Sequence, residues 1–429
     1  MLRTILRLKL CSIANLPLLG IALICGSVTA SAQDAVVGTC NPSIPSYDEL
    51  QDAVDGVPNG GVVAVCPGKW AQQVRITKSL SLMGVRSGND ALPVIVPPVG
   101  GLVQNAIGLT VGGFMHGKRI AAQILVTPGI TVDISNLALD ATGGVASCSP
   151  ANDALAPVGI YFQQASGSVT HVAAKNQSNT CVGPQGDGVL VQNGSVPSKT
   201  VTVQSSSFRN FGWMAVEASA NTAGATVTYD GNTLVGPGAT DGNGLWVSYG
   251  AGGTISNNSI SDALRTGDAT GFWGIIGVCP SRLTVSNNMI GNTDTGIAII
   301  NNPSNCGAVY GAAGDMITNN QVFDSATVGI QVCGSKNTVQ NNNFNDSIVA
   351  AIDLNQGCNS NLNIATQNTV NGTCAAVLAG TDALLNLIAL NDVFNAKNLL
   401  ASGPSCTGGF SPVLLQPGLT KPLPPGQPY

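Results

Sequence analysis

"VSNNMIGNTDTGIAII", residues 285–300, decides the fold, because its parts recur along the chain. It joins a short apolar stretch, a pair of asparagines and a glycine-led apolar strand. The asparagine pair returns as Asn257-Asn258, Asn319-Asn320 and Asn341-Asn342, each time two residues after an isoleucine or valine. A phrase that returns in this way is typical of a repeat architecture.

The period of the repeat indicates a solenoid of strands. Anchor positions lie 22 to 32 residues apart, at Ser205, Gly231, Asn257, Asn287, Asn319, Asn341 and Thr366. A second strand, usually led by glycine, recurs once per period, as at Gly159, Gly188, Gly244, Gly296 and Gly329. Because the repeat has short strands and no helical 3.6-residue pattern, we predict an all-β, single-stranded parallel β-helix.

The asparagine pair is expected to be a structural corner of each coil. Neighbouring coils of a parallel β-helix are stacked at ~4.8 Å, so equivalent side chains form ladders along the axis. Asparagine tolerates left-handed backbone, and its amide can bond to the amide of the next coil. Isoleucine, valine and leucine then fill the inward rows.

The N-terminus has the pattern of an export signal. Arg3, Arg7 and Lys9 precede an apolar stretch from Leu16 to Val28, which ends in the small residues Ala30-Ser31-Ala32. The alternative, a membrane anchor, is weaker because the apolar stretch is shorter than the ~20 residues that span a bilayer. We therefore expect residues 1–32 to be a signal peptide, and a secreted, periplasmic or cell-surface protein that is not integral to the membrane.

Ten cysteines would remain after removal of the signal with Cys11 and Cys25, which is an even number suited to disulfides. Spacing of about one period predicts the inter-coil pairs Cys279–Cys306 and Cys333–Cys358. Nearness in sequence favours Cys40–Cys66, Cys148–Cys181 and Cys374–Cys406, although ten cysteines permit many other pairings.

The charge of the chain limits its partners. Without the signal, 22 acidic residues stand against 14 basic ones. A net negative protein without a lysine or arginine cluster is not expected to bind nucleic acid, and a polyanionic substrate is disfavoured. We expect a monomer that contacts a polysaccharide or a cell-surface glycan.

Both ends of the solenoid require a cap. Ser46-Tyr-Asp-Glu49 has the pattern of a capping box, and Leu50, Ala53, Val54 and Val57 follow with helical spacing, which predicts a short N-terminal capping helix. The β-helix with this cap is expected over residues 33–380. Residues 381–429 are assigned to a C-terminal cap and a proline-rich tail.

The stretch from Leu50 to Gly84 contains a helical "LQDAVDGV", then Pro67-Gly-Lys-Trp70, then "VRI" and "LSLMG". It resembles the N-terminal region of right-handed parallel β-helix proteins of the pectin-lyase-like superfamily. The resemblance implies a right-handed coil over roughly residues 46–380. It implies no particular activity, since the superfamily includes lyases, hydrolases, esterases, epimerases and proteins without known activity, and none of their catalytic motifs is present.

One region is rich enough in polar and aromatic residues to suggest chemistry. Asp262, Arg265 and Asp268 lie close together in sequence and are the candidate catalytic residues, since glycan cleavage uses paired carboxylates. Trp246, Trp273, Arg209 and Glu217 are the candidate substrate-binding residues, since exposed tryptophans stack on sugar rings. The alternative is that the aromatic residues fill the core and Arg265 only pairs with Asp262.

A second candidate site is a column of aspartates ahead of the glycine-led strands, at Asp187, Asp241, Asp268 and Asp294. Stacked carboxylates could hold Ca²⁺, which takes six to eight oxygen ligands. The alternative is that aspartate before glycine only forms a turn. The sequence thus predicts an exported β-helix that binds a polysaccharide along the face of its coils, with cleavage of that polysaccharide left open. The rival hypothesis is a non-catalytic structural or adhesive surface protein.

Overall fold

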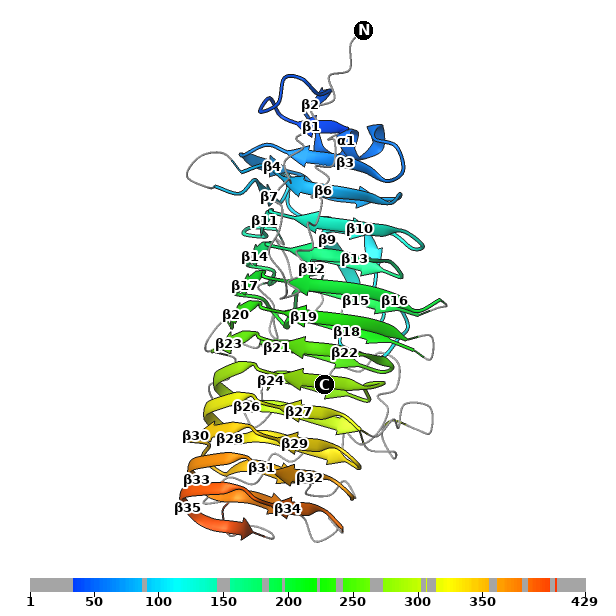
Figure 1. Ribbon diagram of the computed structural model, residues 1–429. Helices are drawn as coiled ribbons and strands as arrows, with labels where there is room; N and C mark the ends of the chain where they lie inside the picture. Colours follow the sequence, from blue (N-terminus) through cyan, green and yellow to red (C-terminus); the bar gives the residue numbers. More distant parts are fainter. Residues whose placement is uncertain are drawn as a thin grey trace, which may run out of the picture. The chain divides into compact units, whose positions relative to one another are not determined.

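The computed structural model describes residues 34–86, 91–144, 155–179, 185–194, 197–221, 224–236, 242–262, 273–301, 306, 314–354, 361–379, 385–401 and 406. Each coil of the chain contributes strands to two long sheets, and the coils are stacked along one axis (Figure 1). Apart from the pairing of β8 (Ala106–Ile107) with β9 (Arg119–Val126), the paired strands are parallel. The predicted all-β parallel β-helix is confirmed.

Sheet A has 14 strands and forms one side of the solenoid. Its strands are β2 (Ser46–Tyr47), β1 (Ala35–Val37), β3 (Gly61–Val65), β6 (Leu80–Gly84), β10 (Thr131–Ser135), β13 (Ser166–Thr170), β16 (Lys199–Gln204), β19 (Ala225–Asp230), β22 (Ala251–Ser256), β25 (Leu283–Ser286), β27 (Met316–Thr318), β29 (Thr338–Gln340), β32 (Ile364–Thr366) and β34 (Leu387–Ala389).

Sheet B has 21 strands and two arms. The short arm follows the asparagine corner and contains β4 (Lys69–Ala71), β7 (Val94–Val96), β11 (Ala138–Asp140), β14 (Ala173–Lys175), β17 (Ser207–Arg209), β20 (Thr233–Val235), β23 (Ser259–Ser261) and β30 (Asn343–Asn345). The long arm contains β5 (Val74–Ile76), β8, β9, β12 (Ala156–Gln163), β15 (Asp187–Asn193), β18 (Met214–Ala220), β21 (Asn243–Ser248), β24 (Trp273–Val278) and β31 (Ala350–Leu354). Four strands run through both arms: β26 (Met289–Asn301), β28 (Gln321–Gly334), β33 (Thr369–Ala379) and β35 (Asp392–Ala401).

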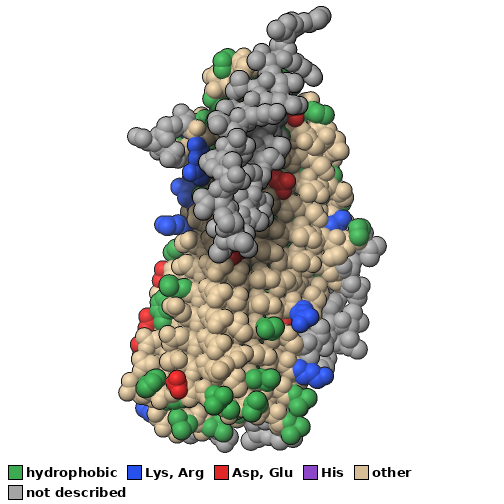
Figure 2. All heavy atoms as spheres, in the orientation of Figure 1, with side chains coloured by type: hydrophobic (Ala, Val, Ile, Leu, Met, Phe, Trp, Pro, Cys, Tyr) green, Lys and Arg blue, Asp and Glu red, His purple; other side chains and the backbone are tan. Residues whose placement is uncertain are grey.

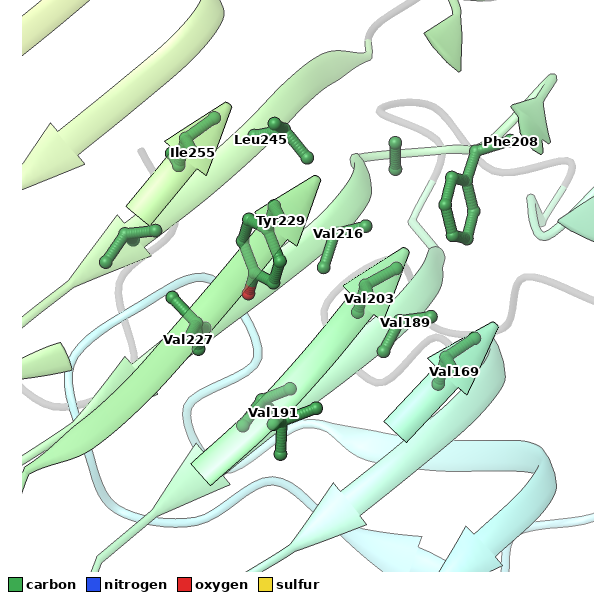
Figure 3. Packing of buried hydrophobic residues seen from close by; sticks show 14 of the residues in the cluster. Val169, Val189, Val191, Val203, Phe208, Val216, Val227, Tyr229, Leu245 and Ile255 are labelled. Atoms are coloured by element: carbon green, nitrogen blue, oxygen red, sulfur yellow. The ribbon is translucent and has the colours of Figure 1, made fainter. Parts of the chain in front are cut away.

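The core runs along the axis between the two sheets. Alternate residues of each strand point inward, so Val203 and Val227 of sheet A face Val189, Val216 and Leu245 of the long arm (Figure 3). These side chains are fully buried. Burial of each contributes about 1.5–3 kcal/mol relative to exposure, and the hydrophobic effect therefore fixes which face of every strand turns inward.

The two asparagines of each pair have different structural roles. The first asparagine of each pair takes left-handed backbone, with φ of 58°, 57°, 58° and 56° at Asn257, Asn287, Asn319 and Asn341. The second is buried and donates through its side-chain Nδ2 to the Oδ1 of the next coil at 2.9–3.0 Å, in a ladder through Asn232, Asn258, Asn288, Asn320, Asn342, Asn368 and Asn391. The predicted anchor at Thr366 is wrong by one residue, since Gln367 has the left-handed backbone, with φ of 58°.

The N-terminal helix α1 (Leu50–Gly56) closes one end of the core through buried Leu50, Ala53 and Val54, as predicted. The predicted capping box is wrong, because Ser46 belongs to β2 and the helix has no side-chain cap from its N-cap residue Glu49. Instead, the side-chain Oε1 of Gln72 accepts the backbone N–H of Leu50 at 2.8 Å. A residue of the next coil thus satisfies the helix terminus.

Three of the predicted disulfides are present: Cys40–Cys66, Cys279–Cys306 and Cys374–Cys406. Cys333 is also disulfide-bonded, whereas Cys148, Cys181 and Cys358 lie outside the described residues. The observed bridges join positions 26 to 32 residues apart, which is about one coil. The predicted pairings are therefore confirmed wherever the structure describes both cysteines.

The described coils extend to Ala401, beyond residue 380, where the sequence analysis placed the start of the C-terminal cap. In the last coil, Ile388, Val393 and Ala396 occupy inward positions but are only partly buried. The part of the chain that the structure describes contains no helix with the length and apolarity needed to cross a membrane.

Candidate functional site

Three of the predicted site residues, Glu217, Trp246 and Trp273, belong to the long arm. Since Val216 and Leu245 point into the core, Glu217 and Trp246 point outward, and the two residues are paired between β18 and β21. This direction follows from the two-residue period of a strand. Both side chains are nevertheless buried, Trp246 with 2% and Glu217 with 0% exposure.

They are buried because an earlier segment crosses this face. Residues 108–118, which we call the strap, join β8 to β9 and lie over β15, β18 and β21. The backbone N–H of Leu109 donates to the side-chain Oε1 of Gln192 at 2.8 Å, and the Tyr161 hydroxyl donates to the same oxygen at 2.7 Å. Phe114 packs on Trp213 and Trp246, with ring centroids 4.9 and 4.6 Å apart.

Two glycines allow the strap to approach the sheet this closely. A Cβ atom at Gly113 would lie 2.4 Å from Oε1 of Glu217, and at Gly112 it would lie 1.8 Å from the Tyr249 ring. Gly113 also has a φ of +109°, which other residues rarely adopt. Any side chain at Gly113 would therefore lift the strap away from Glu217.

Two carboxyl groups are enclosed beneath the strap. Burial raises the pKa of Glu217 to about 7, while the Ser219 hydroxyl, at 3.2 Å from Oε1, and the backbone N–H groups of Met115 and Phe114 act in the opposite direction. Burial, and secondarily the charge of Glu217, raise the pKa of Asp187 well above its ordinary value. Desolvation thus keeps a proton on these carboxyls at pH values where exposed carboxyls are ionised.

Four buried polar atoms beneath the strap have no hydrogen-bond partner in the protein: Oδ2 of Asp187, Nε2 of Gln192, Oε2 of Glu217 and Nε1 of Trp246. Buried polar groups are nearly always paired, so each unpaired atom requires an explanation. Their shared position on the outer face of β15, β18 and β21 makes this region the strongest candidate for a ligand site.

Aromatic rings surround these atoms. Phe114, Trp213, Tyr249 and Trp273 are partly buried and pack around buried Trp246; we call these five residues the aromatic cluster. The ammonium group of Lys118 lies 5.7 Å from the Trp213 ring centroid, and burial lowers its pKa. The region therefore combines ring faces, one ammonium group and two buried carboxyls whose pKa values are raised.

The structure brings together only some of the predicted site residues. Glu217, Trp246 and Trp273 lie on adjacent strands of the long arm. Arg209 is exposed on β17 of the short arm, in register with Lys175, and is not part of this group. The candidate catalytic residues Arg265 and Asp268 lie outside the described residues.

Asp262, the remaining candidate catalytic residue, occupies a corner. It has a φ of 59°, and its Oδ1 accepts a hydrogen bond from Nδ2 of Asn292 in the next coil at 2.5 Å. Its Oδ2 accepts from the Ser261 hydroxyl at 3.2 Å. These contacts are those of a turn residue, which the sequence analysis considered for the other aspartates.

The predicted Ca²⁺ site is only partly described. Asp241 and Asp268 lie outside the described residues, whereas Asp187 and Asp294 lie within them. The register row of Asp187 continues with Met214 and Asn243 on the next two strands. Among the described residues, no three His, Cys, Asp or Glu side chains form a group that could hold a metal ion. The Ca²⁺ site stays a prediction.

The strap is the part of the site that the sequence analysis missed. It contributes Phe114 and the backbone groups that reach Glu217, although about 100 residues separate it from β18 in the chain. A signal does exist: "GLTVGGFMHG", residues 108–117, has four glycines and lies where no repeat anchor was found. A glycine-rich interruption of a repeat indicates an insertion on one face of a solenoid.

Comparison with known proteins supports the fold. The family model for the right-handed β-helix region matches residues 158–306, which confirms the handedness implied by the resemblance. No curated protein sequence matches the chain significantly. One similar solved structure is the A-module of the mannuronan C-5 epimerase AlgE6 of Azotobacter vinelandii, with 13% identity, coverage of 80% of this chain and 94% of that chain, and a TM-score of 0.49. Another is PfbA, a surface adhesin of Streptococcus pneumoniae, with 12% identity, coverage of 83% of this chain and 89% of that chain, and a TM-score of 0.49. The GH136 lacto-N-biosidase of Eubacterium ramulus is also similar, with 10% identity, coverage of 85% of this chain and 65% of that chain, and a TM-score of 0.46.

Proposed function

We propose that this right-handed parallel β-helix protein binds a glycan at the aromatic cluster, on the outer face of β18, β21 and β24. The observation that carries the proposal is the packing of four partly exposed rings around buried Trp246, beside unpaired polar atoms of Glu217 and Asp187. Aromatic faces with a few polar groups at fixed positions are the usual composition of small-molecule and sugar sites.

Cleavage is less well supported than binding. Both known geometries for glycoside hydrolysis need two carboxyl groups that reach the scissile bond or a water beside it. Glu217 and Asp187 are fully buried beneath the strap, so neither carboxyl reaches a bound chain unless the strap moves. Binding without cleavage is also what the rival hypothesis of an adhesive surface protein requires.

Three inter-coil disulfides support export, since such bridges persist in oxidising compartments. They agree with the signal-like N-terminus. We therefore place the glycan outside the cytoplasm, where the protein would meet cell-surface or secreted polysaccharides.

A glycan-array screen of the secreted protein tests the proposal. Wild type would be compared with Trp213→Ala and Trp273→Ala, and with Met316→Ala as a matched control, because Met316 is an exposed apolar residue on sheet A. Loss of binding in both tryptophan variants, with retention in the control, is the expected result. Equal binding by all four proteins would remove the aromatic cluster from the function.

Product analysis on every bound glycan separates binding from catalysis. We expect intact glycan after incubation with wild type. Release of shorter chains by wild type but not by Glu217→Gln would instead show that the strap opens and that the Glu217 carboxyl takes part in cleavage. In that case the protein would be an enzyme, with binding as its first step.

A further inference from the structure

A groove lies on the outer face of the short arm, over the last coils. It has a volume of about 610 Å³ and is lined mainly by Gln321, Phe323, Asn343, Asn345, Asn371 and Phe394, from β28, β30, β33 and β35. None of these residues was among the candidates from the sequence. Figure 2 shows hydrophobic side chains gathered over the last coils on the face turned to the viewer.

Two aromatic rings mark the ends of one register row in this groove. Phe323 pairs with Asn345, Asn345 with Asn371, and Asn371 with Phe394. The two phenylalanines are therefore three strand spacings apart, or ~14 Å at ~4.8 Å per strand. Phe394 is 56% exposed, so its ring is open to a ligand.

The ring of Phe323 is held in place by the preceding coil. It lies over Gly291, its register partner, where a Cβ atom would meet the ring at 2.0 Å. The absence of a side chain at Gly291 leaves the space that the Phe323 ring occupies beside β26. The Phe323 ring is thus a fixed platform that does not need to be ordered when a ligand binds, which lowers the entropic cost of binding.

The asparagines between the rings are also oriented in advance. Nδ2 of Asn371 donates to Oδ1 of Asn345 at 2.7 Å, and Nδ2 of Asn395 donates to Oδ1 of Asn371 at 2.7 Å. A primary amide has two donor hydrogens and two acceptor lone pairs, so this ladder uses only part of its capacity. Asn345 and Asn371 line the groove together with exposed Gln321 and Asn343, which brings several amide groups to one surface.

The charge around the groove selects between glycans. None of the described residues that line it is charged. Asp324, Asp346 and Asp392 belong to the same turns and strands, and Lys397 lies further along β35. A uronate or sulfated chain would therefore meet mainly like charges, whereas hydroxyl groups can pair with neutral amides.

We propose that this groove binds an uncharged glycan chain that lies along the solenoid axis, with sugar rings stacked on Phe323 and Phe394 and hydroxyl groups bonded to the asparagines between them. A polymer of repeating sugar units suits this surface, because the surface itself repeats once per coil. This surface is separate from the aromatic cluster, which lies on the long arm, and the inference does not depend on the proposed function there.

Isothermal titration of the full chain tests the inference, with neutral hexasaccharides of glucose, xylose and mannose as probes and polygalacturonate and alginate as charged competitors. We expect Phe323→Ala and Phe394→Ala each to weaken binding about 2- to 12-fold, from the 0.5–1.5 kcal/mol of an aromatic contact, and the double variant to lose it. Phe394→Tyr, which keeps the ring, should bind as wild type does, and so should the sheet A control Met316→Ala.

Gly291→Ala supplies a readout that a general effect on folding would not give. It should displace the Phe323 ring and weaken binding as much as Phe323→Ala, while thermal unfolding followed by circular dichroism shows that the coils remain folded. The inference is overturned if no neutral hexasaccharide binds, if a charged polymer binds more tightly, or if the phenylalanine variants bind as wild type does. Loss confined to Trp213→Ala would assign all glycan binding to the aromatic cluster.

Discussion

Replacement of Asn288 by alanine should destabilise the protein by about 3–5 kcal/mol, although Asn288 lies in no candidate site. Its Nδ2 donates to Oδ1 of Asn320 at 2.9 Å and to the carbonyl oxygen of Ile255 at 3.0 Å. Its Oδ1 accepts from the backbone N–H and from Nδ2 of Asn258, at 3.0 and 2.9 Å. Asn288 is 1% exposed, so water cannot replace these bonds without entering the core.

The magnitude follows from the groups that alanine would leave unpaired. A buried donor or acceptor without a partner costs about 1–3 kcal/mol, and at least two would result, on Asn258 and Ile255. Loss of the side-chain volume adds a cavity contribution. The total is a large fraction of the ~5–15 kcal/mol by which a domain is stable.

Urea unfolding followed by tryptophan fluorescence measures this loss. Asn287→Gly is the matched control, because Asn287 is exposed and its φ of 57° suits glycine; its effect should stay within about 1 kcal/mol. The slope of the free energy of unfolding against urea concentration must be the same in both proteins for the comparison to hold, since solenoids can unfold in parts. A free energy of unfolding for Asn288→Ala within about 1 kcal/mol of wild type would refute the stabilising role of the ladder.

Three further predictions concern the strap, a buried carboxyl and a disulfide. Gly113→Ala should lift the strap and lower the free energy of unfolding by about 2 kcal/mol or more. The lifted strap should expose Trp246, so acrylamide should quench the tryptophan fluorescence more strongly than in wild type. Gly117→Ala is the control: Gly117 has a φ of +63° and no atoms within 4 Å of an added Cβ, so the quenching should not change. Burial raises the pKa of Asp353 from 3.8 to about 7, so the folded state favours the proton and stability falls as pH rises through this range. Urea unfolding of wild type should therefore show a free energy of unfolding that falls between about pH 5 and about pH 8, and in Asp353→Asn this fall should be roughly 2–3 kcal/mol smaller. The same pH dependence in both proteins would contradict the raised pKa of Asp353. Replacement of both Cys279 and Cys306 by serine opens a loop of 27 residues and should cost about 3–4 kcal/mol; an equal urea midpoint in wild type and variant would show that the bridge adds nothing.

The features that could be predicted from the sequence are those that repeat. Asn258, Asn288, Asn320 and Asn342 occupy equivalent corners, so each occurrence supports the interpretation of the others. Alternation along β18 and β21 likewise predicts that Glu217 and Trp246 point away from the core. Both inferences need only the period of the coil and the two-residue period of a strand.

The features that could not be predicted depend on single contacts between distant parts of the chain. The exposure of Trp246 was wrong because Phe114, which belongs to no repeat, covers it. The capping box failed because Gln72 of the next coil, and not Ser46, satisfies the N-terminus of α1. In both cases a tertiary contact replaced what the local pattern indicated.

The two proposed binding surfaces lie where the outward residues differ from one coil to the next, and this follows from the fold. A perfect β-helix presents the same side chain at every coil, so no part of its surface is distinct from another. The row of Gly291, Phe323 and Asn345 changes residue type at each step, and the row of Leu190, Glu217 and Trp246 does the same beneath the strap. The inward rows keep one residue class because the core requires it, whereas the outward rows are free to vary. Recognition of a particular glycan can therefore be built on the outer rows without loss of the core that holds them in register.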